Sequence, residues 1–148
     1  NGAARVFCGW VSDRLGRENT MILTFVLQAI CLFLVVAVGQ YSAAMFSVTL
    51  VLVYFTWGQI FALFPATAGD YFGSKHATSN YAVLYTAKGA ASIIGGWFGA
   101  FLYEQSGSWT MGFYGSATMA LIAAGMAVAL RASRESGRAV APVPAVAK

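Results

Sequence analysis

Long stretches without a charged side chain constrain this sequence more than any other feature. Fifty consecutive residues from Thr20 to Gly69 contain no Asp, Glu, Lys or Arg, and 26 more separate Glu104 from Arg131. A helix of about 20 apolar residues crosses a bilayer core of about 30 Å. Only 9% of all residues are charged, against about 25% in a soluble domain. We therefore predict an all-α integral membrane protein.

Five hydrophobic segments follow one another along the chain. The predicted spans are 1–11, 20–38, 43–68, 78–103 and 110–130. Pro65 lies near the end of the third span, where a helix is expected to kink or stop. Residues 131–148 are basic and then rich in Ala, Pro and Val, which predicts a disordered tail. Because Asn1 opens an apolar segment and no signal peptide precedes it, we expect the chain to begin inside a helix of a longer protein.

The placement of Lys and Arg predicts the orientation. Residues 12–19 hold two of them, residues 69–77 hold one besides His76, and residues 131–148 hold four, whereas the turns 39–42 and 104–109 hold none. If the spans alternate in direction, all three positive segments lie on one side, which is then cytoplasmic. We expect a multi-pass protein of the cell (inner or plasma) membrane with a cytoplasmic C-terminus.

Several function classes are not supported by the sequence. The net charge is +4, but the positive residues form no patch, so nucleic acid is not an expected partner. Cys8 and Cys31 lie in apolar segments without metal-ligand spacing and are expected to be small core residues. His76 is the single His, and no carboxylate pair or nucleophile accompanies it. We therefore expect no catalytic residues, no metal site, no cofactor and no enzyme.

Two cations lie where a membrane helix ordinarily has none. At 1.5 Å per residue, Arg5 and Lys88 are about 10 Å and 15 Å from the predicted cytoplasmic ends of their helices. A cation near the bilayer midplane costs at least about 2.5–3.5 kcal/mol and therefore needs a partner. All five acidic residues lie in loops, at span ends or in the tail. The partner is either an acid outside this chain or a bound anion, and two cations match a dicarboxylate best.

Aromatic residues share the helix faces that carry these cations. Tyr85 lies three residues before Lys88 and therefore on the same face, while Trp57 and Phe61 belong to an aromatic stripe in the third span. Such a stripe is typical of plain helix packing. It also fits an aromatic cage around a small planar ligand, with cation–π contacts to the two positive groups.

The polar segment after the first span carries a specific motif. Its pattern, GxxxDRxGR, is formed by Gly9, Asp13, Arg14, Gly16 and Arg17. It resembles the signature loop of the major facilitator superfamily, except that Glu18 replaces a residue that is basic in many members. Since four spans follow, the resemblance implies the C-terminal part of a twelve-helix fold, with about four and a half transmembrane helices here. We expect a charge latch that biases the inward- or outward-facing state; a solvated turn is the alternative.

Two segments, 1–17 and 85–90, also resemble the oxalate/formate antiporter family, and the likeness extends over about residues 1–130. In that family an Arg of the eighth helix and a Lys of the eleventh bind the substrate carboxylates, and aromatic residues enclose the ligand. The resemblance places Arg5 and Lys88 in the cationic positions. It places Trp57, Phe61 and Tyr85 in the aromatic ones.

We therefore predict a secondary transporter of small carboxylates, an oxalate:formate-type anion exchanger that works by alternating access. One alternative is a proton-coupled monocarboxylate transporter, which needs a titratable carboxylate within the spans. Another is a non-transporting membrane scaffold or channel, which leaves Arg5 and Lys88 without a role. The expected partners are a small carboxylate, the lipid bilayer and the N-terminal half of the same transporter.

Overall fold

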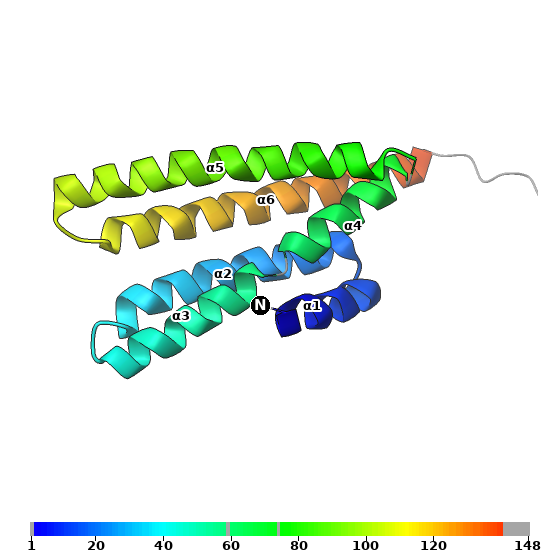
Figure 1. Cartoon of the computed structure of the whole chain (residues 1–148). Coiled ribbons are helices and arrows are strands. Elements are labelled where there is room, and N and C mark those ends of the chain that lie inside the picture. The colour runs from blue at the N-terminus through cyan, green and yellow to red at the C-terminus, as the bar shows by residue number, and fades with distance from the viewer. Residues whose placement is uncertain (1, 59, 74, 141–148) are drawn as a thin grey trace, which may run out of the picture.

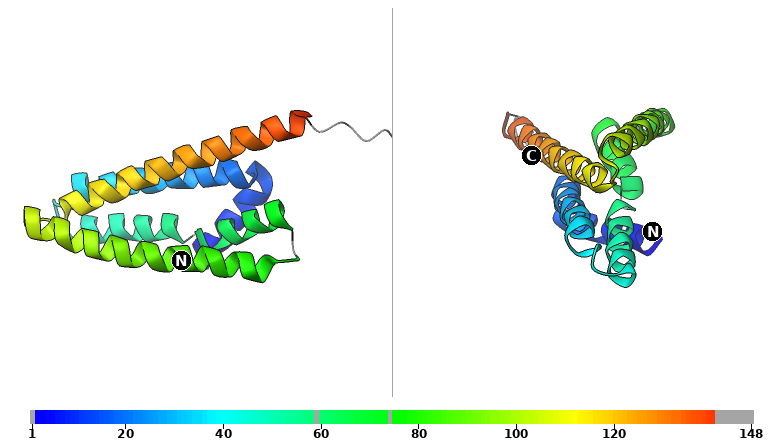
Figure 2. Two further views of the ribbon diagram at one scale, coloured as in Figure 1. Left: turned by 90° about the horizontal axis from the view of Figure 1, so that it is seen from above. Right: turned by 90° about the vertical axis from the view of Figure 1, so that its left-hand side faces the viewer.

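The computed structural model is all-helical and describes residues 2–58, 60–73 and 75–140. Its helices α2 and α6 pack along each other, α3 lies beside α2, and α4 contacts α1 and α5 (Figures 1 and 2). The helices are α1 (Gly2–Leu15), α2 (Arg17–Val38), α3 (Ala43–Trp57), α4 (Ile60–Phe72), α5 (Ala77–Ser106) and α6 (Thr110–Val140). The predicted helical class is confirmed.

Three stretches of the described chain are long and apolar enough to cross a bilayer. They are Arg17–Val38, Ala43–Phe72 and Thr110–Ser136. The 30 residues of α5 are enough to cross a bilayer. However, Lys88 and several Ser, Thr and Gly residues lower the mean hydropathy of this helix. With 14 residues, α1 is too short by itself. Both helices coincide with predicted spans, and their position in a membrane stays a prediction.

The segment expected to be a polar loop after the first span is almost entirely helical. Between the end of α1 at Leu15 and the start of α2 at Arg17, Gly16 alone makes the turn. Its φ angle is +88°, a left-handed conformation that glycine adopts without steric cost. The chain therefore reverses within one residue and keeps the motif residues on rigid helices.

The predicted third span is interrupted, although not at Pro65. The interruption separates Trp57, the last residue of α3, from Ile60, the first of α4, and Pro65 lies inside α4. A proline ring clashes with the carbonyl four residues earlier, here that of Phe61, and offers it no N–H. Pro65 therefore supplies no backbone N–H to the carbonyl of Phe61, and the two residues remain in α4.

The last helix continues beyond its predicted end. Residues 131–140 are helical, where the sequence predicted a tail that begins at Arg131, and residues 141–148 lie outside the described residues. Ten further residues lengthen a helix by about 15 Å. This extension brings Arg131 and Arg134 to the beginning of α2.

Candidate functional site

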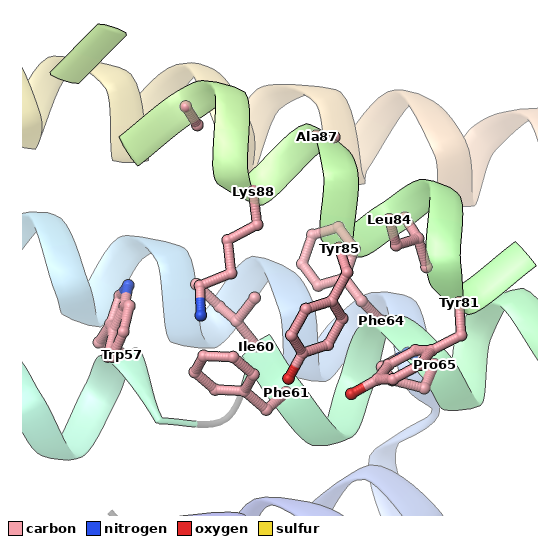
Figure 3. Close-up of a pocket in the computed structure, with 11 residues that line it drawn as sticks. Trp57, Ile60, Phe61, Phe64, Pro65, Tyr81, Leu84, Tyr85, Ala87 and Lys88 are labelled. Atoms are coloured by element: carbon pink, nitrogen blue, oxygen red, sulfur yellow. The ribbon is translucent and has the colours of Figure 1, made fainter. Parts of the chain in front are cut away.

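An aromatic pocket of about 310 Å³ lies between α4 and α5, beside the interruption of the third span (Figure 3). Most of its lining is apolar, and Lys88 is the charged member. We call this set the aromatic pocket: Trp57, Ile60, Phe61, Phe64, Pro65, Tyr81, Leu84, Tyr85, Ala87, Lys88 and Ala91.

The ammonium group of Lys88 lies among three aromatic rings. Its Nζ atom is 4.0 Å from the ring centroid of Phe61 and 5.5 Å from those of Trp57 and Tyr85. In Figure 3 the lysine extends from α5 toward Trp57 and Phe61. Ring faces carry partial negative charge and attract a cation at such distances. The rings therefore stabilise the ammonium group while leaving its full positive charge in place.

Arg5 reaches the same aromatic group from α1. Its Cζ atom lies 4.7 Å from the ring centroid of Phe61, so one ring contacts both cations that the sequence singled out. Within the described part of the chain, neither cation forms an ion pair with a carboxylate. The structure thus brings together all five residues predicted to bind substrate: Arg5, Trp57, Phe61, Tyr85 and Lys88.

The rings of the pocket also contact one another. Trp57 and Phe61 are almost perpendicular, with centroids 5.3 Å apart, and the Phe61 and Tyr85 centroids are 6.3 Å apart. Tyr81, which was not among the predicted binding residues, has its ring centroid 4.7 Å from that of Tyr85. Tyr81 precedes Lys88 by two helical turns, and this spacing already predicts that it shares the face of Lys88.

A second group of charges gathers at the end of the bundle where α1 meets α2. We call it the ion-pair cluster: Asp13, Arg17, Glu18, Asp70, Tyr71 and Arg134. Arg17 lies 3.0 Å from a carboxylate oxygen of Asp13 and 3.2 Å from one of Asp70. It also donates a hydrogen bond of 2.9 Å to Ser12. One guanidinium group therefore connects α1, α2 and α4.

Glu18 is the buried carboxylate of the ion-pair cluster. Only 7% of the residue is exposed. It forms an ion pair with Arg134 of α6 and accepts a hydrogen bond of 3.1 Å from the hydroxyl of Tyr71 in α4. Three helices thus meet at one carboxylate, which the extension of α6 makes possible. The predicted positive segments indeed lie together at one end of the bundle.

Comparison with known sequences matches the chain to the Major Facilitator Superfamily over residues 1–146. It belongs to this family. Membership makes it a multi-pass membrane protein of a transporter superfamily and not an enzyme, and it confirms the resemblance seen in the motif. The helices described above form part of that fold.

Two related proteins align with large parts of this chain. Over 127 residues this superfamily member is 38% identical to the "Oxalate:formate antiporter" of Oxalobacter formigenes, covering 86% of this chain and 30% of that protein. Over 87 residues it is 30% identical to "Apicoplast pyruvate carrier 2" of Toxoplasma gondii, covering 59% of this chain and 13% of that protein. The chain therefore spans less than a third of the length of either relative.

The superfamily motif contributes only partly to the ion-pair cluster. Asp13 and Arg17 belong to it, and Gly16 forms the turn between their helices. Arg14 lies instead over the ring of Trp10 on its own helix, with 4.1 Å from Cζ to the centroid.

The remaining motif residue, Gly9, lies within α1, and a Cβ atom added there would meet open space. Four members of the ion-pair cluster were missed from the sequence: Glu18, Asp70, Tyr71 and Arg134. Each lies in a segment of the predicted positive side, but nothing in the sequence pairs Glu18 with a residue 116 positions away.

The structure places both cysteines inside helices. Cys8 and Cys31 are both buried within helices, with 5% exposure each. Across the described ranges no group of three or more His, Cys, Asp and Glu residues is placed to hold a metal ion.

Proposed function

We propose that the chain is part of a secondary transporter of small carboxylates that exchanges anions of the oxalate:formate type. The observation that carries this proposal is the pair of cations over one ring, Arg5 and Lys88 over Phe61, without a carboxylate partner in the described chain. An arginine offers a planar fork to a carboxylate, and a lysine offers a compact charge. Similarity to a protein named as an oxalate:formate antiporter supports the same substrate class.

The interrupted third span supports alternating access. Transporter sites commonly form where helices are discontinuous near the bilayer midplane, and Trp57 and Phe61 flank the interruption beside the aromatic pocket. Closing an empty site around two cations removes both from water, at a cost of about several kcal/mol per ion. A bound dicarboxylate offsets that charge, so the loaded carrier reorients more readily than the empty one. This difference favours obligatory exchange.

We also propose the orientation and the missing partner. The ion-pair cluster lies on the cytoplasmic side of the cell membrane and acts as the latch that biases one access state. The C-terminal half of a twelve-helix transporter contains this chain, and the N-terminal half covers the open side of the aromatic pocket. The carboxylate substrate, the lipid bilayer and that N-terminal half are then its partners.

The test uses the complete transporter that contains this chain, reconstituted into vesicles preloaded with oxalate or formate. Uptake of labelled oxalate should require an internal anion and should fall to background in Lys88→Ala. Lys75→Ala is the matched control, because it removes an exposed lysine between α4 and α5 and should exchange like the wild type. Exchange at the wild-type rate in Lys88→Ala would refute the proposed site.

A second candidate is transport of monocarboxylates coupled to protons. The relative named as a pyruvate carrier favours it, although no carboxylate accompanies the two cations in the part of the chain described. The same vesicles separate the two functions. Uptake into empty vesicles that follows an imposed pH gradient supports proton coupling, whereas uptake that needs an internal anion supports exchange.

A further inference from the structure

The end of α3 beside the aromatic pocket is held to α2 by a polar contact. Thr56, the residue before Trp57, is 4% exposed, and its hydroxyl donates a hydrogen bond to the side-chain carbonyl oxygen of Gln28 in α2. Figure 1 shows α2 and α3 side by side. Because lipid offers no hydrogen-bond partners to polar side chains, such bonds favour one arrangement of neighbouring helices. This contact joins the last turn of α3 to α2.

The same helix contains a natural control for this contact. Thr49 and Thr56 are the two buried residues of α3. They lie seven positions apart and therefore on the same face. The hydroxyl of Thr49 bonds only to carbonyl oxygens of its own helix, those of Met45 and Phe46. Thr56 also contacts its own helix, and it adds two contacts to α2, the bond to Gln28 and a contact with the Cys31 thiol. The two threonines therefore differ in their side-chain bonding to α2.

We propose that Thr56 and Gln28 are positioning residues of the aromatic pocket: their hydrogen bond holds the end of α3 on α2 and so sets the place of Trp57. Consecutive residues of a helix point about 100° apart, so Thr56 faces α2 while Trp57 faces the pocket. Trp57 is the last residue of α3. The ring centroid of Trp57 lies 5.3 Å from that of Phe61. It lies 5.5 Å from the Nζ atom of Lys88.

The test compares Thr56→Val, Gln28→Leu and Thr49→Val in the complete transporter. The KM measurement rests on the proposed function, because oxalate is its substrate. Thr56→Val and Gln28→Leu should each raise the KM for oxalate about three- to tenfold, and the double variant should add little. Thr56→Ser keeps the hydroxyl group and should therefore have the wild-type KM. Thr49→Val should lower Tm less than Thr56→Val, because it removes no interhelical bond, and it should leave the KM unchanged.

A substrate-independent measurement separates this inference from the proposed function. In a background in which every Trp of the complete transporter except Trp57 is replaced by Phe, Trp10, Trp97 and Trp109 included, the fluorescence reports Trp57 alone. Emission should shift to longer wavelength in Thr56→Val and in Gln28→Leu but not in Thr49→Val. If the wild type fails to exchange oxalate, the proposed function is wrong and the fluorescence decides the positioning role. Identical emission in Thr56→Val and Thr49→Val would overturn the inference.

Discussion

The aromatic pocket and the ion-pair cluster differ in the groups that contact their positively charged side chains. In the ion-pair cluster, Arg17 and Arg134 both contact carboxylates from other helices. At the aromatic pocket, Arg5 and Lys88 contact ring faces, and no carboxylate of the described chain reaches them. Where the fold supplies the counter-charge, the group is part of the architecture. Where it supplies only aromatic rings, the positive charge remains available to a ligand.

The most direct way to abolish this difference is to give the pocket its own carboxylate. Phe61→Glu places a negative charge where the shared ring now contacts Arg5 and Lys88. Each charge-assisted hydrogen bond contributes about 1.5–3 kcal/mol, so the loss of two should reduce oxalate exchange by at least about a hundredfold. The measurement is exchange in vesicles, with Phe61→Gln as the uncharged control of the same size.

The two variants should also differ in heat resistance. Phe61→Glu should unfold at a higher temperature than Phe61→Gln, because its carboxylate pairs with two cations. Equal exchange rates in the two variants would show that the pocket does not use its positive charge.

The converse experiment removes a counter-charge from the ion-pair cluster. Arg134→Ala leaves Glu18 buried without its cation, which should lower the free energy of unfolding by about 1–3 kcal/mol. The measurement is reversible unfolding in detergent. Adding Glu18→Gln should recover much of the loss, since a neutral amide still accepts a hydrogen bond from Tyr71. If Glu18→Gln instead adds its own full loss, the two residues do not act as a pair.

A smaller effect is expected at the guanidinium that joins three helices. Arg17→Lys keeps the charge, but an ammonium group cannot contact Asp13, Asp70 and Ser12 in the same fork geometry. Because Asp13 and Asp70 are well exposed, the loss should be about 0.5–1 kcal/mol. Arg14→Lys, outside the ion-pair cluster, is the matched control. A larger loss of unfolding free energy in Arg14→Lys would mean that the contact of Arg14 with Trp10 stabilises this end of the bundle more than the contacts of Arg17 do.

The smallest effect belongs to the exposed pair on the α6 extension. Arg131 and Glu135 lie 2.9 Å apart, with side chains 49% and 65% exposed. Pairs of this kind in helices contribute about 0.3–0.5 kcal/mol, so Glu135→Gln should hardly change Tm. The change should disappear in high salt. A loss as large as that of Arg134→Ala would mean that burial does not decide the strength of these pairs.

The sequence predicts the fold better than it predicts the details of its helices. Charge-free stretches of about 20 residues have few stable conformations in a bilayer other than a helix, which explains why the all-α class was correct. The place of the interruption was not predicted, because the sequence pointed to Pro65 as the break and that residue lies inside α4. Helix formation beyond Leu130 depends on contacts with the start of α2, which local composition does not contain.

The same distinction applies to the two sites. Arg5 and Lys88 stand out because a cation in an apolar segment needs a compensating group, and periodicity then selects Tyr85 from the same face. The partners of Glu18 come from α4 and α6 and could be identified only after the helices had been packed. The contact between Gln28 and Thr56 was missed for the same reason, since neither residue is unusual in its own segment.

The single ring of Phe61 beneath two cations has a consequence for how such a carrier diverges. A change at this position alters the surroundings of Arg5 and of Lys88 together, so under the proposed function the preferences for the two ends of the anion cannot evolve separately through it. Replacing Phe61 by Tyr would add a hydroxyl that both cations sense, whereas a change at Trp57 or Tyr85 acts only on the lysine side. Broad shifts in substrate choice are therefore expected to begin at Phe61, with fine adjustment following at its neighbours.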